Sequence, residues 1–154
     1  MLTIGIILCG DKDYEIPKEI WREEIDKITN RLSEKEEEWK LKFIYEKTLE
    51  NTPLLKRMYE EGNTIEEGKI EFMPIVTDWL RYKDNAGWKR DQKMIENGNY
   101  CLCFLPSQDK LQSTPAKYIL PKARKEKLIV REIYPVETKI ERKEIKPGSL
   151  TLSI

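Results

Sequence analysis

Residues Leu2–Cys9 form a run of mostly aliphatic side chains with the length of one β-strand. A strand that is apolar on both faces is typical of the centre of a parallel sheet, where helices cover both sides. The run ends at Gly10, and Asp11, Lys12 and Asp13 follow it. This pattern predicts an α/β fold in which a tight, acidic loop follows a central strand. Such a loop can approach a ligand closely with its backbone and its carboxylates.

Helix and strand patterns alternate along the rest of the sequence. A helix with apolar residues at helical spacing begins at Pro17, and later helices are expected to begin at Thr52-Pro53, Asp84-Asn85 and Thr114-Pro115, where a polar residue can act as the cap. Residues 34–39 are expected to be a solvated helix end or loop. Further strands are predicted at 41–45, 70–76, 100–105 and 128–134.

Such strand–helix–strand units have right-handed crossovers and produce a parallel sheet. We therefore expect a Rossmann-like three-layer sandwich with a sheet of about five mostly parallel strands and helices on both faces. The length of 154 residues fits one domain, placed at residues 1–134. Residues 135–154 are predicted to form an extension, either a hairpin or a contact with another subunit of a homodimer or larger homo-oligomer.

The composition excludes several classes of function. Lys plus Arg and Asp plus Glu both number 28, so the chain lacks the net field of a general nucleic-acid or anionic-membrane binder, and nucleic acid is the less favoured partner. Histidine is absent, which removes the usual neutral-pH acid/base and the commonest metal ligand. We predict no metal and no cofactor.

Three cysteines, Cys9, Cys101 and Cys103, lie inside apolar strand patterns. Their odd number argues against a complete disulfide framework and favours a reducing, cytoplasmic location. Cys101 and Cys103 share one face of a strand, as buried small hydrophobes or, alternatively, as a redox or metal pair. The apolar run from Leu2 to Leu8 lacks a basic n-region, so we do not expect it to act as a signal peptide. No run in the sequence approaches the roughly 20 apolar residues of a membrane span.

Residues 74–114 contain two loops that are expected at neighbouring strand tips, where open α/β sheets bind ligands. Arg90, near the start of a helix, could grip a phosphate or carboxylate with two nitrogens, or be a surface arginine paired with Asp91 or Asp84. Thr114, with Ser113, could bind a phosphate, or be an ordinary helix cap.

Other candidates are polar or aromatic residues with two possible roles. Asp11 and Asp13 could hold ribose hydroxyls or polarise a water, or simply form the turn. Aromatic rings at 79, 82 and 88 could stack on a base or pack onto the core. The weak catalytic candidates are Asp11, Asp13, Glu46 and Glu50; the predicted ligand-binding residues are Gly10, Asp11, Asp13, Trp79, Tyr82, Gly87, Trp88, Arg90, Ser113 and Thr114.

The spacing of these residues resembles a known family. Gly10 to Tyr14 matches G-S-R-D-[FY], and residues 78–94 match D-W-x-x-[YH]-G-x-x-A-G-x-x-R-N-x-x-M at Asp78-Trp79, Tyr82, Ala86-Gly87, Arg90 and Met94. This pattern is similar to the YspA-type branch of the SLOG superfamily, and more distantly to LOG-type phosphoribohydrolases and DprA-type proteins. The resemblance implies a Rossmann-like domain that binds a nucleotide-like molecule.

The chain also departs from that family. The segment from Glu46 to Thr52 contains no glycine where the family has a glycine-rich loop, and the later P-G-G-x-G-T loop keeps only Pro106 and a Ser113-Thr114 pair. Without glycines, backbone amides approach a phosphate less closely. The glutamate that the hydrolases use has no counterpart, since Pro115, Ala116 and Lys117 occupy its place.

Three functions follow as hypotheses. The first is a sensor, sequestering or regulatory protein that binds a nucleotide-derived molecule without hydrolysing it. The second is a nucleotide N-glycosidic-bond hydrolase in which a carboxylate such as Asp11 acts as base or nucleophile. The third is a DNA-binding or scaffold protein, whose Lys and Arg residues from 122 to 146 are interleaved with Glu.

Overall fold

The computed structural model describes residues 2–35, 38–62, 69–135 and 138–141. Its sheet has the order β3-β2-β1-β4-β5-β6. The first five strands are parallel, and β6 runs antiparallel to β5. The prediction of an α/β fold with about five mostly parallel strands is confirmed. The strands are β1 (Leu2–Gly10), β2 (Trp39–Glu46), β3 (Ile70–Ile75), β4 (Tyr100–Phe104), β5 (Ile129–Ile133) and β6 (Thr138–Glu141).

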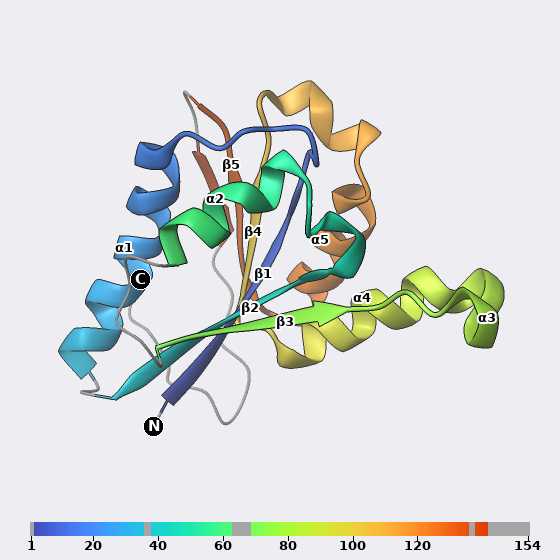
Figure 1. The fold of residues 1–154 in the computed structure, drawn as a ribbon, viewed down its shortest axis with the longest axis horizontal. Coiled ribbons are helices and arrows are strands. Elements are labelled where there is room, and N and C mark those ends of the chain that lie inside the picture. The colour runs from blue at the N-terminus through green and yellow to red at the C-terminus, as the bar shows by residue number, and fades with distance from the viewer. Residues whose placement is uncertain (1, 36–37, 63–68, 136–137, 142–154) are drawn as a thin grey trace.

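Helices cover both faces of this sheet (Figure 1). Helices α1 (Lys18–Lys35) and α2 (Pro53–Gly62) pack on one face, and α4 (Ala86–Asn97) and α5 (Ala116–Lys125) pack on the other. The short helix α3 (Trp79–Tyr82) lies beyond β3, away from the sheet. Among the helices that the structure describes, none is long and apolar enough to cross a lipid bilayer.

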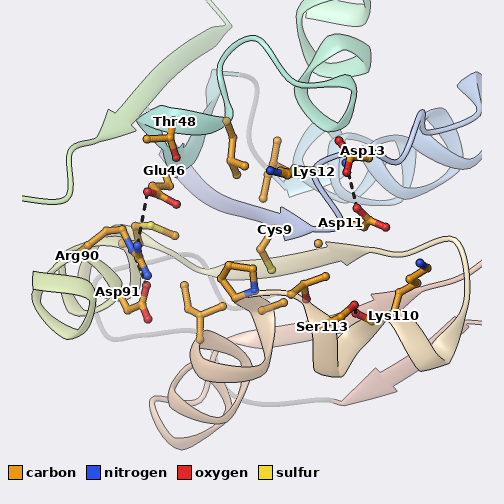
Figure 2. A pocket seen from close by; sticks show the side chains of 18 residues that line it. Cys9, Asp11, Lys12, Asp13, Glu46, Thr48, Arg90, Asp91, Lys110 and Ser113 are labelled. Carbon is orange, nitrogen blue, oxygen red and sulfur yellow. Dashed lines mark hydrogen bonds and ion pairs between the residues drawn. The ribbon is translucent and has the colours of Figure 1, made fainter.

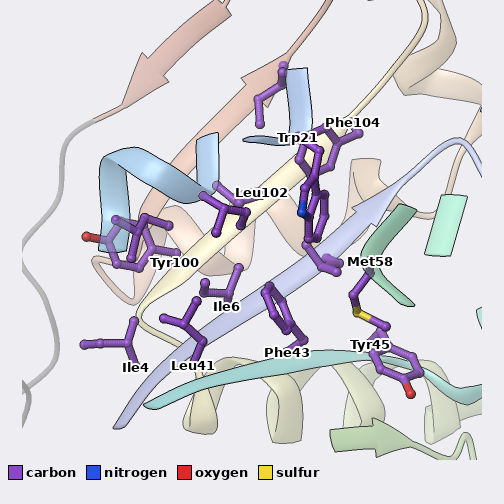
Figure 3. Packing of buried hydrophobic residues seen from close by; sticks show 14 of the residues in the cluster. Ile4, Ile6, Trp21, Leu41, Phe43, Tyr45, Met58, Tyr100, Leu102 and Phe104 are labelled. Carbon is purple, nitrogen blue, oxygen red and sulfur yellow. The ribbon is translucent and has the colours of Figure 1, made fainter. Parts of the chain in front are cut away.

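Strand β1 explains why the first apolar run is so continuous. Ile4, Ile6 and Leu8 are buried on the side of α1 and α2, whereas Ile7 and Cys9 are buried on the side of α4 and α5. Both faces of the strand are therefore core. On the first side, Figure 3 shows the ring of Trp21 beside those of Phe43 and Phe104, whose centres lie 5.6 and 5.7 Å from it.

The chain changes direction across the sheet between β1 and β4. Strands β1, β2 and β3 follow each other outward on one side, and the connection through α4 then returns the chain to the other side of β1. Loops at such a switch point diverge, so a crevice opens at the carboxyl ends of the two strands. The fold thus provides a ligand-sized opening beside the loop after Gly10.

Two expectations about chain segments are wrong. Trp39 belongs to β2 and is 8% exposed, because Lys69 covers its ring and its side chain joins the core under α1. The first of the two loops expected within residues 74–114 contains a short helix, α3, because the Asp78 carboxylate accepts a hydrogen bond of 3.0 Å from the Arg81 amide and caps it.

Three predicted side-chain caps are also absent. Asn85 precedes α4 without such a bond, and Pro115, rather than Thr114, immediately precedes α5. The hydroxyls of Thr52 and Thr114 donate backward, to the carbonyls of Leu49 and Leu111, at 2.7 and 3.0 Å. In both Thr-Pro pairs the threonine hydroxyl closes the turn that precedes the helix. The pattern therefore marks the start of each helix correctly, but through a bond to the preceding turn rather than through a helix cap.

The C-terminal extension begins with strand β6. Strand β6 pairs with β5: Thr138 lies opposite Ile133 at one end of the ladder, and Glu141 lies opposite Val130 at the other. The extension therefore adds an antiparallel strand to the edge of the sheet. The hairpin or subunit contact was predicted for residues 135–154, of which residues 136–137 and 142–154 lie outside the described residues.

Candidate functional site

A cavity of about 390 Å³ opens at the carboxyl ends of the central strands (Figure 2). Its wall comes from the loop after β1, the 3-10 helix after β2, the first turns of α4, and the segment that leads into α5. It therefore occupies the switch point of the sheet. The lining residues are Leu8, Cys9, Gly10, Asp11, Lys12, Asp13, Glu46, Thr48, Leu49, Arg90, Asp91, Met94, Lys110, Ser113, Thr114, Pro115, Ala116 and Ile119.

The loop after β1 is shaped by close contact with β4. Gly10 has a φ of +135°, and a Cβ atom there would lie 2.0 Å from the carbonyl oxygen of Phe104. Only glycine fits this position. The next amide, of Asp11, donates to the same carbonyl at 3.2 Å, and the Asp11 carboxylate accepts a bond of 3.0 Å from the Asp13 amide. Asp11 thus forms the turn, as its alternative role predicted, and both aspartates line the cavity.

Arg90 links three elements at the opposite end of the cavity. Its Nε donates to Asp91 Oδ1 at 2.9 Å, and its Nη1 donates to Thr77 Oγ1 at 3.2 Å. The same Nη1 lies 3.6 Å from Glu46 Oε1, which also accepts a bond of 3.2 Å from the Thr77 hydroxyl. Arg90 thus pairs with Asp91, as one of the two alternatives predicted. Its side chain is only 13% exposed, however, so it is not the surface arginine that this alternative described.

Asp91 is the buried member of this network, with 4% of its surface exposed. Burial raises the pKa of its carboxyl, against the opposing effects of Arg90 and of Lys122, whose Nζ lies 3.9 Å from Oδ2. Since the folded state then holds a proton more tightly than the unfolded chain, this group favours folding at low pH. That contribution is lost as the pH rises through the raised pKa.

The cavity has no surplus of positive charge. Arg90 and the exposed Lys12 and Lys110 face four carboxylates in the wall, those of Asp11, Asp13, Glu46 and Asp91. Figure 2 shows these side chains in two groups, one around Arg90 and one around Lys12 and Lys110, with Cys9 between them. The site is suited to a ligand with several hydrogen-bonding groups and little net charge.

The hydroxyls before α5 are already used within their own turn. Ser113 Oγ donates to the carbonyl of Lys110 at 3.0 Å, as Thr114 Oγ1 does to Leu111. Both residues line the cavity, but their hydroxyl protons point to the backbone. They can accept hydrogen bonds from a ligand more readily than they can donate them.

Cys9 contributes to the apolar floor of the cavity. Its Sγ lies 3.9 Å from that of Cys101, and all three cysteines are buried and reduced. Contact with Cys9 and burial raise the pKa of Cys101 well above its ordinary value, so its reactive thiolate is disfavoured. No group of metal ligands occurs within the described residues. These observations favour the cysteines as buried small hydrophobes.

Five predicted site residues lie elsewhere. Trp79 is 61% exposed on α3, Trp88 is 50% exposed on α4, and Glu50 pairs with Lys47 at 3.4 Å outside the cavity. Tyr82 lines a separate groove on the other side of α4, and Gly87 lies in the first turn of that helix. The three aromatic rings therefore do not line this cavity, and their stacking on a base stays a prediction.

Sequence reasoning missed several lining residues. Lys12, Thr48 and Lys110 belong to the predicted strand-tip loops, so the rule that located the loops could have included them. Met94 and Ile119 project from helices, and their sequence pattern is that of any core residue.

Comparisons with family models, with curated proteins and with solved structures found no match to this chain. The sheet order 3-2-1-4-5 with helices on both faces defines a Rossmann-like α/β protein. Membership of the SLOG superfamily stays a prediction from the motifs.

Proposed function

We propose that the cavity binds a nucleotide or nucleotide-derived small molecule, and that the protein is a sensor, sequestering or regulatory protein. The observation that carries this proposal is the cavity at the switch point, with charged side chains at both ends, Asp11 at one and Arg90 at the other (Figure 2). Its volume of about 390 Å³ lies within the range of small-molecule sites. The predicted SLOG resemblance supports the same class of ligand.

The lining indicates which part of such a ligand each wall suits. Leu8, Leu49 and Met94 offer an apolar surface to a base, and the carboxylates of Asp11 and Asp13 can accept bonds from ribose hydroxyls. Cations and carboxylates in the cavity wall nearly balance. The carboxylates would therefore repel the negative charge of a triphosphate, and the wall has too few cations to neutralise that charge. Nucleosides, monophosphates and ADP-ribose therefore fit better than triphosphates.

The arrangement favours binding over hydrolysis. A carboxylate that acts as base or nucleophile must be able to reach the substrate. Glu46 is instead paired with Arg90, and Asp11 is engaged in its turn. Both carboxylates therefore already use part of their hydrogen-bonding capacity within the protein, which supports binding over hydrolysis.

A thermal-shift panel tests this proposal. Nucleosides, mono-, di- and triphosphates, ADP-ribose and cyclic nucleotides are compared at equal concentration. A ligand present at about 100 times its Kd adds about 2.7 kcal/mol of stability and raises Tm by several degrees. We expect the largest shift from a low-charge member and the smallest from a triphosphate. An unchanged Tm across the panel, for a protein shown to be folded by circular dichroism, would contradict the proposal.

A further inference from the structure

Positive charge is concentrated in one part of this neutral chain. Residues 76–128 contain eleven Lys or Arg and six Asp or Glu, a surplus of five, which the remainder of the chain balances with an equal deficit. This segment supplies α3, α4 and α5, which lie on one side of the sheet and beyond its edge (Figure 1). Positive charge therefore predominates in the segment that supplies these three helices, although the net charge of the chain is zero.

Aromatic rings alternate with cations across these helices. The Arg81 guanidinium lies 5.3 Å from the centre of the Tyr82 ring, and Lys89 Nζ lies 5.6 Å from the same ring. Lys89 is also 5.5 Å from the Trp88 ring, which Lys122 approaches to 5.5 Å from α5. These contacts join Arg81, Tyr82, Lys89, Trp88 and Lys122 into one row from α3 to α5, which we call the cation–aromatic row.

Grooves border the row at both ends. One of about 700 Å³ lies between β3, α3 and α4. Its charged lining residues are Arg81, Lys89, Arg90 and Lys93 with Asp78 and Glu96, so cations predominate in this groove, which Tyr82 also lines. A second, of about 260 Å³, has Trp88 and Lys122 in its wall, where Lys122 and Lys125 are balanced by Glu96 and Glu126. The row is thus part of a hollowed surface along which an extended chain can lie.

We propose that the cation–aromatic row binds single-stranded nucleic acid. Its alternation of cation and ring corresponds to the alternation of phosphate and base along a single strand, and aromatic faces stack on any base. The existing contacts between cations and rings are weak at exposed positions, so phosphates and bases can replace them. A duplex keeps its bases paired and stacked, and would leave the rings without partners.

Fluorescence anisotropy with a labelled oligothymidylate of about 20 nucleotides tests the proposal, since such a strand exceeds the site size of one small domain. The wild type should bind the oligonucleotide at low salt. A plot of the logarithm of the association constant against the logarithm of the salt concentration should have a slope of about −2 to −3, as expected for three to four phosphate contacts. A duplex of equal length should bind more weakly. Absence of binding at low salt would overturn the proposal.

Two variants and one matched control locate the surface. Lys89→Gln combined with Lys122→Gln should weaken binding about tenfold at low salt and reduce the salt slope. Trp88→Ala should weaken it about tenfold through lost stacking. The control, Lys27→Gln with Lys56→Gln, removes two lysines from the opposite face, where they pair with Glu23 and Glu60, and should leave the affinity within about twofold.

Other outcomes would assign the cation–aromatic row differently. Equal loss in the variant and control pairs would indicate diffuse attraction, and unchanged affinity in Trp88→Ala would indicate a polyanion site that does not read bases. Binding to phosphatidylserine vesicles in place of the oligonucleotide would indicate a membrane surface. Each result contradicts the proposal. Thermal melting of every variant confirms that it is folded.

Discussion

Replacing Arg131 with Met should lower the free energy of unfolding by about 3–5 kcal/mol. Arg131 lies on β5 and is 8% exposed, and its Nε donates to both carboxylate oxygens of Glu24, at 3.1 and 2.7 Å. Its Nη2 donates to the same carboxylate. Glu24, on α1, is 4% exposed, so the variant leaves a buried carboxylate without its cation. Urea unfolding followed by circular dichroism measures the change.

The double variant Glu24→Leu with Arg131→Met separates the two contributions. It removes both charges, so no unpaired ion remains in the core, and we expect it to recover most of the stability lost in Arg131→Met. A double variant as unstable as Arg131→Met alone would show that packing of the two side chains, rather than charge pairing, holds α1 on β5.

Gly10→Ala should destabilise the protein by at least about 2 kcal/mol and remove ligand binding. The added Cβ would lie 2.0 Å from the Phe104 carbonyl oxygen, and the φ of +135° adds strain of about 1–3 kcal/mol for any other residue. The end of β1 must then separate from β4, which moves one wall of the cavity. Urea unfolding and the thermal-shift panel measure the two effects.

Gly87→Ala is the matched control for that substitution. The nearest atom to its added Cβ is Arg90 Nη2, at 3.7 Å, an ordinary contact, and alanine is favoured over glycine within α4. This variant should be as stable as the wild type or more so. If Gly10→Ala and Gly87→Ala had the same free energy of unfolding, the close approach of β1 to β4 at Gly10 would be contradicted.

The features that the sequence predicts well are those with a local physical cause. The apolar run of β1 indicates burial on both faces, and Gly10 and the aspartates after it mark a strand tip that reaches the cavity. The order of helices and strands then determines a parallel sheet. These inferences need only neighbouring residues and the rules of crossover handedness.

Features that depend on distant residues were not predictable in this way. The partners of Arg90 include Thr77 and Glu46, and Glu46 is 44 positions earlier in the chain, so the charge balance of the cavity follows only from the fold. The threonine hydroxyls offered as caps bond backward because local turns compete for them. Trp88, a predicted ligand-binding residue, is 50% exposed and lines a groove outside the cavity.

The central claim is that the cavity at the switch point binds a nucleotide-derived ligand. Calorimetric titration of the most stabilising ligand of the panel into wild type, Arg90→Ala and Arg22→Ala tests it directly. Arg22 pairs with Glu61 on the far side of the sheet, so its variant controls for the loss of an arginine from an ion pair. We predict one site per chain, bound at least about tenfold more weakly by Arg90→Ala and unchanged by Arg22→Ala. Equal affinity in all three proteins would contradict the assignment of this cavity as the binding site.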